Sequence, residues 1–304
     1  MPDTSDPWPR LGLVVALLTI VVTCLYLGVA AYFGDESLIA PCQADVVVYH
    51  QYARSIAEGH PFRLVASDAA TTGCTGHLYV FLLACAAAAG VALPDLAGVS
   101  FLLGICCYLV FLHSFRRVAI RIDSRAAMPA LILVLLSGYV AFTAFGQSDM
   151  PLFMALSASA FAFALEKRFV ALGVILFLAS LARPEGILLS VTWFVKAGFD
   201  RLRGTDTDSG PLFAGLAGLA GMVVVILVNV HFTGHAAFDS LNGKGLYRLP
   251  MLQALSATAA HGVRFVSEVI LGFAGTGSWR VFFWPTCLGG MMLMCGLGMK
   301  TRTE

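Results

Sequence analysis

The sequence predicts an all-α, polytopic transmembrane protein, and three observations lead to this fold class. Of the 304 residues, 59% are hydrophobic and only 12% are charged, whereas soluble domains carry roughly 25% charged residues. The mean hydropathy is +0.84. The apolar residues form long runs that are separated by short polar connectors. In a bilayer such runs fold as helices, because a helix satisfies its own backbone hydrogen bonds.

The apolar runs define one membrane domain, 1–304, of about 8 helices. The first run, 11–33, is long enough to span a bilayer, and we expect it to be an uncleaved anchor rather than a signal peptide. A segment at 252–273 has an amphipathic pattern. The remaining apolar runs cover residues 77–92, 97–115, 128–146, 151–166, 169–182, 184–198, 212–231 and 281–298.

The first polar loop, 34–76, contains the first polar, patterned segment of the chain. Residues 43–58 predict a helix that stops at Gly59 and lies in the membrane interface. Asp45 lies at its start, where a carboxylate either caps free N–H groups or is presented to a site. The helix has an apolar stripe and a polar stripe. The apolar stripe consists of Tyr49, Tyr52, Ala53 and Ile56, and the polar stripe of His50, Arg54 and Glu58.

The cations predict the orientation of the chain. Arg10 before the first run, with Asp35 and Glu36 after it, favours an N-terminus on the inside. Four further groups of cations follow apolar runs, and the positive-inside rule places all of them on the cytoplasmic side. They are Arg116, Arg117, Arg121 and Arg125; Lys167 and Arg168; Lys196, Arg201 and Arg203; and Lys300 and Arg302.

These groups share one side only if residues 77–115 cross the membrane once. We therefore expect 77–91 to be a shallow or re-entrant helix on the outer side, and 97–115 to cross alone; this is the single-crossing interpretation. An ordinary two-crossing hairpin is the alternative, and it would place Arg116–Arg125 outside. The single-crossing interpretation leaves four segments on the outer side, which are 34–76, 146–149, 183–186 and 231–280.

Ionisable residues of these outer segments are the candidate site residues. Asp45 and Asp149 each lie beside the end of an apolar run, where a charge is costly unless it has a partner or a task. Each also has a simpler interpretation as a helix cap, with Pro151 marking the first turn after Asp149. Arg183 and Glu185 flank Pro184, and they could simply pair with each other in a turn. Lys244 could be a solvated loop cation.

Other classes of site find little support in the sequence. His231 and His235 have the spacing of two metal ligands on one helix face, but Thr233 and Gly234 lie between them, so we expect no metal site. No P-loop, dinucleotide fingerprint or Gly-x-Ser-x-Gly elbow occurs. We expect no nucleic-acid partner. Cys42 and Cys74 both lie in the first loop and could form a disulfide if that loop faces an oxidising compartment.

The order of these features resembles the GT-C superfamily of membrane glycosyltransferases. An acid follows the first span in an amphipathic helix, and a second acid occupies a short outer connector about 100 residues later. An Arg-Pro-Glu break at 183–185 comes next, followed by the loop motifs Asn229–Gly234 and Asn242–Lys244. The superfamily includes protein O-mannosyltransferases, lipid A aminoarabinose transferases and mycobacterial arabinofuranosyltransferases. Relatives are commonly longer, so we expect this chain to be either a fragment or a minimal version.

The resemblance implies an inverting sugar transfer from a polyprenyl-phosphate carrier to a hydroxyl of a glycan, lipid or protein acceptor. It assigns Asp45 as the general base and Asp149 as a residue that orients the acceptor or the base. Lys244, Arg183 and Arg248 are its candidates for the carrier phosphate, with Tyr49, His50, Arg54 and Glu185 as further substrate-binding residues. The donor is the lipid-linked sugar, no cofactor is required, and no motif supports a divalent metal.

The implied location is the bacterial inner membrane, in contact with membrane lipids, with the site facing the periplasm. Two other functions stay open at this point: a transporter or flippase of a lipid-linked or polar solute, and a non-catalytic membrane subunit. A transporter often has two related halves and charged or broken helices near the membrane centre, whereas this chain shows no internal repeat and places its charges at the ends of its runs.

Overall fold

The computed structural model describes residues 20, 21, 24, 46–204 and 208–236. All regular elements within these residues are helices, so the described part of the chain is all-α, as predicted. The chain forms two compact units, and the candidate site lies in the unit made of Cys42–Met128 and Thr143–Arg264. Most of helix α5 (Ala127–Leu136) and most of α6 (Gly138–Phe145) belong to the other unit.

Helix α2 (Val46–Ala57) has the two faces that its sequence predicts, and it packs on α3 (His77–Ala88). Tyr52 is 2% exposed, and the ring of Tyr49 meets that of Tyr79 edge to face at 5.5 Å. The polar face is divided between two environments. His50 is buried and hydrogen bonds to Ser100 at 2.7 Å, whereas Arg54 forms an exposed pair with Glu58.

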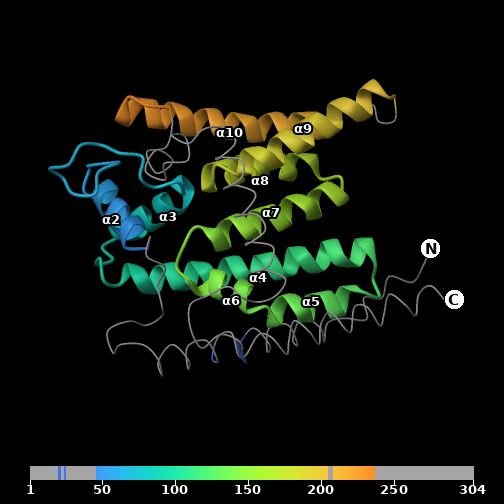
Figure 1. The fold of residues 1–304 in the computed structure, drawn as a ribbon, viewed down its shortest axis with the longest axis horizontal. Helices are drawn as coiled ribbons and strands as arrows, with labels where there is room; N and C mark the ends of the chain where they lie inside the picture. Colours follow the sequence, from blue (N-terminus) through green and yellow to red (C-terminus); the bar gives the residue numbers. More distant parts are fainter. Residues whose placement is uncertain (1–19, 22–23, 25–45, 205–207, 237–304) are drawn as a thin grey trace, which may run out of the picture. The chain divides into compact units, whose positions relative to one another are not determined.

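Helix α4 (Leu96–Ile122) and helix α7 (Met150–Leu165) pack side by side and run in the same direction (Figure 1). Ser114 on α4 hydrogen bonds to Ser159 on α7 at 2.9 Å. Near the ends of both helices, Nε of Arg117 donates to Glu166 at 2.9 Å. The cations near the ends of α4 and α7 therefore lie at the same end of the two helices. The single-crossing interpretation and the two-crossing hairpin both place these two groups on one side, so this contact does not decide between them.

Helices α8 (Phe169–Ala182), α9 (Gly186–Leu202) and α10 (Gly210–Thr233) pack closely because glycines stand where they meet. A Cβ at Gly221 would lie 2.6 Å from the carbonyl oxygen of Phe177, and one at Gly218 would lie 2.0 Å from Oγ of Ser190. Small residues of this kind let membrane helices approach each other closely. Helix α10 consequently lies directly against α8 and α9 (Figure 1).

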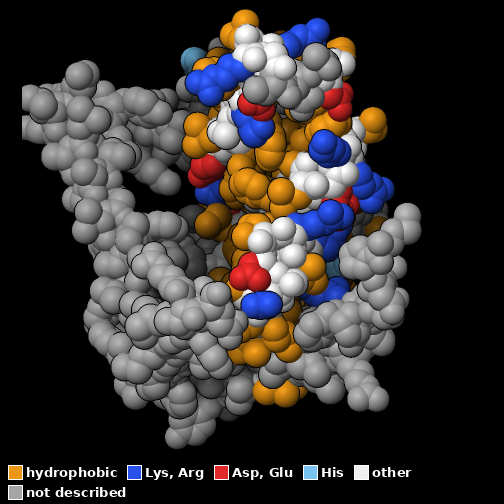
Figure 2. Space-filling view, turned by 90° about the vertical axis from the view of Figure 1, so that its right-hand side faces the viewer, with side chains coloured by type: hydrophobic (Ala, Val, Ile, Leu, Met, Phe, Trp, Pro, Cys, Tyr) orange, Lys and Arg blue, Asp and Glu red, His pale blue; other side chains and the backbone are white. Residues whose placement is uncertain are grey.

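Two of the described helices, α4 and α10, are long and apolar enough to cross a membrane, judged by length and composition. Helices α3, α7 and α8 are apolar but shorter. Lys and Arg side chains gather over the end of the helices that faces the viewer in Figure 2, with hydrophobic side chains between them. Near the ends of α4 and α7, the guanidinium groups of Arg117 and Arg168 lie 5.0 and 5.2 Å from the ring centroid of Phe163.

Several predictions fall on residues outside those that the structure describes. They concern Asp45, Lys244, Arg248, most of the anchor at 11–33, the segment at 252–273 and the run at 281–298. Cys42 is also outside the described residues, and Cys74 is a buried free thiol rather than half of a disulfide. The run predicted at 128–146 is divided into α5 and α6, which meet at Ser137.

Candidate functional site

The acid of the second outer connector, Asp149, does not cap the helix that it begins. It is the N-cap residue of α7, and a proline stands in the first turn, as the sequence predicts. Its side chain nevertheless makes no cap hydrogen bond. The residue is only 1% exposed, so its carboxylate is directed into the protein. The simple capping interpretation of Asp149 is therefore wrong.

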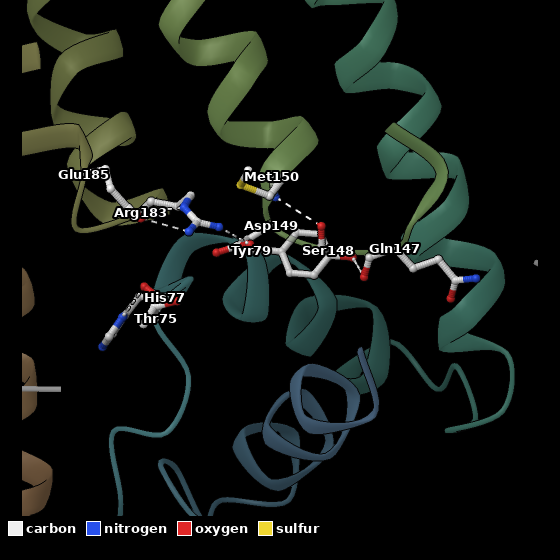
Figure 3. A network of polar contacts seen from close by, with 9 residues as sticks. All are labelled: Thr75, His77, Tyr79, Gln147, Ser148, Asp149, Met150, Arg183 and Glu185. Atoms are coloured by element: carbon white, nitrogen blue, oxygen red, sulfur yellow. Dashed lines mark hydrogen bonds and ion pairs between the residues drawn. The ribbon is translucent and has the colours of Figure 1, made fainter. Parts of the chain in front are cut away.

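The partner of Asp149 is Arg183, which follows the end of α8 (Figure 3). Nη1 of Arg183 donates to Oδ1 of Asp149 at 2.8 Å. The other edge of the guanidinium donates to Glu185, from Nε at 3.2 Å and from Nη2 at 2.9 Å. Gly186 allows the tight turn, because a Cβ there would lie 2.3 Å from the carbonyl oxygen of Ala179.

The two carboxylates bound to Arg183 differ in burial, and this difference sets the strength with which each is held. The Asp149 side chain is 2% exposed and that of Glu185 is 51% exposed. Removing one partner of a buried ion pair costs about 3–5 kcal/mol, because a charge is left without compensation. An exposed pair contributes about 0–1 kcal/mol. Arg183 therefore has one fixed partner and one weakly held partner.

The remaining oxygen of Asp149 faces Gly76, the residue before α3. A Cβ at Gly76 would lie 2.8 Å from Oδ2 and 2.8 Å from Cβ of Asp149, so only glycine permits this approach. Oδ2 is buried and makes no hydrogen bond of normal geometry within the described residues. An unsatisfied buried acceptor is costly, about 1–3 kcal/mol. Such groups in native proteins require an explanation, and a catalytic or binding role is one.

The charges of the site act on one another. Burial raises the pKa of the Asp149 carboxyl above its ordinary value, and Arg183 opposes this rise. Burial likewise raises the pKa of the Tyr49 hydroxyl, and the neighbouring Asp149 carboxylate adds to the effect. Burial alone would lower the pKa of Arg183, but Glu185 and Asp149 raise it. The guanidinium is therefore a permanent cation, while Asp149 binds a proton more readily than an ordinary aspartate.

The connector that carries Asp149 is held in an uncommon backbone conformation. Gln147 has φ 56°, in the left-handed region that residues other than glycine rarely adopt. Its carbonyl oxygen accepts a hydrogen bond of 2.9 Å from the hydroxyl of Tyr79. Its buried Oε1 has no hydrogen-bond partner among the described residues. Strained backbone is frequent at functional sites, because surrounding contacts must hold it in place.

A second polar contact joins the start of α3 to the end of α10. Nε2 of His77 lies 2.8 Å from Oδ1 of Asn229. Phe62, which also has a left-handed backbone (φ 60°), stacks on Phe232 with ring centroids 4.9 Å apart and lies 5.4 Å from the ring of His77. Because His77 directly follows Gly76, this contact holds the segment that packs on Asp149.

The structure thus brings together four of the nine predicted site residues, Tyr49, Asp149, Arg183 and Glu185. His50 and Arg54 have other partners: His50 is bonded to Ser100 on α4 and Arg54 to Glu58 on its own helix. The other three predicted residues, Asp45, Lys244 and Arg248, lie outside the described residues.

Three residues that the sequence did not single out also contribute, namely Gly76, His77 and Tyr79. The only signal for them was their position at the start of an apolar run, beside a turn-rich segment.

Arg183 and Asp149 together can bind an anion and accept a proton at neighbouring positions. Across residues 46–204 and 208–236, no cluster of three or more His, Cys, Asp or Glu side chains could hold a metal ion. Comparisons with protein-family models, curated proteins and solved structures find no match to this chain. The function must therefore be inferred from this geometry and from the order of motifs in the sequence.

Proposed function

We propose that the chain is a polytopic membrane glycosyltransferase of the GT-C type, which transfers a sugar from a polyprenyl-phosphate carrier to an acceptor hydroxyl. One observation carries the proposal. Segments that lie far apart in the sequence, and that the motif order selects, converge on one buried acid: Tyr49 of α2, Asp149 before α7, and Arg183 with Glu185 after α8. The two long apolar helices support the membrane location.

The site residues have the properties that this transfer needs. The departing carrier phosphate gathers negative charge, and a fixed guanidinium in a low-dielectric site stabilises that charge. Arg183 is such a group, because it stays protonated and is held by a buried carboxylate. The attacking hydroxyl must lose its proton to a positioned base, a contribution of typically 10²–10⁴-fold in rate.

Two acids share the work on the acceptor in this proposal. Asp45, which directly precedes α2 in the sequence, is the general base. Asp149 orients the acceptor or the base through its Oδ2. Attack on the face of the sugar opposite the phosphate inverts the anomeric centre. On this arrangement the site lies on the outer side of the membrane, and the arginine-rich end lies on the cytoplasmic side.

The experiment that tests the function is transfer by the purified full chain in lipid nanodiscs. The donors are radiolabelled polyprenyl-phosphate mannose and polyprenyl-phosphate arabinose, offered with membrane-lipid and glycan acceptors. We expect labelled product from one donor, and loss of that product in Asp45→Asn and Asp149→Asn. Full transfer by Asp45→Asn would refute the assignment of the base. Net flux of the label into liposomes without product would instead identify a transporter.

A further inference from the structure

The side chain most exposed in the site is also the one whose purpose the transfer reaction leaves open. Glu185 binds Arg183 through two parallel hydrogen bonds, of 2.9 and 3.2 Å, yet its side chain is 51% exposed. A carboxylate in this geometry presents two oxygens to the fork of a guanidinium, as a phosphate does. The edge of Arg183 that Glu185 occupies is therefore the edge that a phosphate would use.

The two contacts of Arg183 are unequal in a way that permits exchange on one side only. Nη1 is held by Asp149, whose burial makes that bond costly to break. Nε and Nη2 are held by Glu185, which water can solvate when it leaves. An incoming anion can replace Glu185 while the Asp149 contact keeps the guanidinium in position.

The start of α9 does not offer a competing anion site. Glu185 is the N-cap residue of α9, and its side chain makes no cap hydrogen bond. The first N–H groups of the helix are already bonded, since Gly186 donates to the carbonyl of Arg183, Ile187 to Pro184 and Leu188 to Glu185. The guanidinium is thus the group for which an anion and Glu185 compete.

The geometry points to Glu185 as an exchangeable internal ligand of Arg183 that gives up its place to the phosphate of the lipid carrier. The inference rests on the proposed function, because it takes the ligand to be a polyprenyl phosphate. In the protein without ligand, Glu185 neutralises Arg183. A lipid phosphate must therefore bind Arg183 more strongly than Glu185 does in order to take its place. No covalent step is involved, since one salt bridge replaces another.

The test measures binding of sugar-free polyprenyl monophosphate to the full chain in nanodiscs, by equilibrium binding of the radiolabelled lipid. Glu185→Gln removes the competing charge at nearly constant shape, so we expect a dissociation constant about fivefold lower than that of the unmodified chain. Fivefold corresponds to about 1 kcal/mol. Glu58→Gln is the matched control, because Glu58 is a similarly exposed carboxylate, 47% exposed, paired with an arginine. We expect no change there.

A second variant separates exchange from a general effect of charge. Glu185→Asp keeps the negative charge but shortens the side chain, so the two-bond contact with Arg183 weakens and binding tightens part of the way. If Glu185→Gln tightens binding and Glu185→Asp equals the unmodified chain, charge alone is responsible and the proposal is wrong. Weaker binding in Glu185→Gln would mean that Glu185 positions Arg183, which also overturns it.

The failures of the two proposals can be told apart. If the unmodified chain binds the lipid phosphate and Glu185→Gln binds it equally well, the exchange is refuted and the glycosyltransferase stands. If neither binds it, both are refuted. Arg183→Gln should bind the lipid phosphate far more weakly, both in the unmodified chain and together with Glu185→Gln. Retained binding in Arg183→Gln would show that the phosphate lies elsewhere and would refute the exchange.

Discussion

Two acid–arginine pairs stand at opposite ends of α7, and they differ in burial rather than in chemistry. Asp149 at the start of the helix pairs with Arg183, which follows α8, and Glu166 at its other end pairs with Arg117 of α4. The Asp149 side chain is 2% exposed and that of Glu166 is 19% exposed. The pKa of Asp149 is raised, mainly by burial, whereas the pKa of Glu166 is lowered, mainly by its hydrogen bond from Arg117.

The comparison separates a candidate site from a structural tie. Glu166 has found a partner and gains by being charged, and Arg117 also stacks on Phe163. Asp149 has a partner too, but burial destabilises its charge, and Oδ2 makes no hydrogen bond of normal geometry within the described residues. Arg183 and the Tyr49 hydroxyl offset the effect of burial only in part. A carboxyl whose pKa is shifted by burial in this way is typical of functional sites.

The largest expected difference between the two pairs is in activity. Asp149→Asn keeps the shape of the side chain but removes the acceptor charge, and we expect sugar transfer to fall by about 10²–10⁴-fold, the usual contribution of a positioned acid or base. Glu166→Gln is the control and should stay within a few-fold of the unmodified chain. The measurement is initial-rate transfer from the lipid-linked donor. Equal rates in both variants would mean that the buried acid has no part in the chemistry.

The next expected difference is in stability. Arg183→Ala leaves a buried carboxylate without its cation, and we expect a loss of about 3–5 kcal/mol. Arg117→Ala leaves a partly exposed carboxylate and should cost about 1 kcal/mol. Thermal unfolding in detergent measures both.

The double variant Arg183→Ala, Asp149→Asn sharpens this test, because it leaves no uncompensated buried charge; the Glu185 side chain that also loses Arg183 is 51% exposed. It should therefore recover much of the lost stability. A further loss in the double variant would contradict the account of the buried pair.

The sequence predicted the local features of this region and not its long-range contacts. Apolar periodicity and Pro151 placed the start of α7 within one residue of its observed start at Met150. Ionisable residues beside the ends of apolar runs selected Asp149 and Arg183. The sequence did not predict that these two residues pair, because they are separated by 34 positions. Hydrophobic periodicity describes one helix face at a time and carries no information on contacts between helices.

His50 shows why the rest of the site could not be predicted. It belongs to the polar stripe of α2 together with Arg54, and the pattern gives both residues the same place on the helix face. In the structure His50 is buried, and Ser100 of α4 supplies its hydrogen bond over a separation of 50 positions. A polar residue that is buried with a partner from another helix has the same sequence signature as an exposed one. The contact of Gly76 with Asp149 is equally invisible, because it depends on an absent side chain.

A smaller effect is expected from filling the space between α3 and Asp149. Gly76→Ala places a Cβ 2.8 Å from Oδ2 of Asp149, closer than atoms can approach, so a shift is forced. We expect a loss of about 1–3 kcal/mol in stability, the usual cost of overpacking, together with reduced transfer. Gly98→Ala, inside α4, is the matched control: a Cβ there has no neighbour within 4 Å, and alanine favours a helix over glycine by about 1 kcal/mol. Equal destabilisation by both changes would mean that the close approach of Gly76 to Asp149 does not require glycine.

The smallest effect, and the most direct test of the comparison, is the pH dependence of the two acids. The pKa of Asp149 is higher in the folded chain than in the unfolded one. Between the ordinary aspartate pKa and the raised one, the folded state therefore holds more protons than the unfolded state. The free energy of unfolding falls as pH rises through that window. The pKa of Glu166 is lowered on folding. Its contribution is complete above the ordinary glutamate value and is lost as pH falls through the lowered one.

Melting temperatures of the unmodified chain, Asp149→Asn and Glu166→Gln, measured from about pH 3 to pH 8, separate the two contributions. With rising pH, the unmodified chain should lose stability relative to Asp149→Asn and gain it relative to Glu166→Gln. Opposite slopes from two acids on one helix would show that burial, rather than the presence of an arginine, decides which of them is poised to exchange a proton. Parallel slopes would mean that Asp149 is an ordinary ion-paired carboxylate, and the reason for placing the chemistry at this end of α7 would be lost.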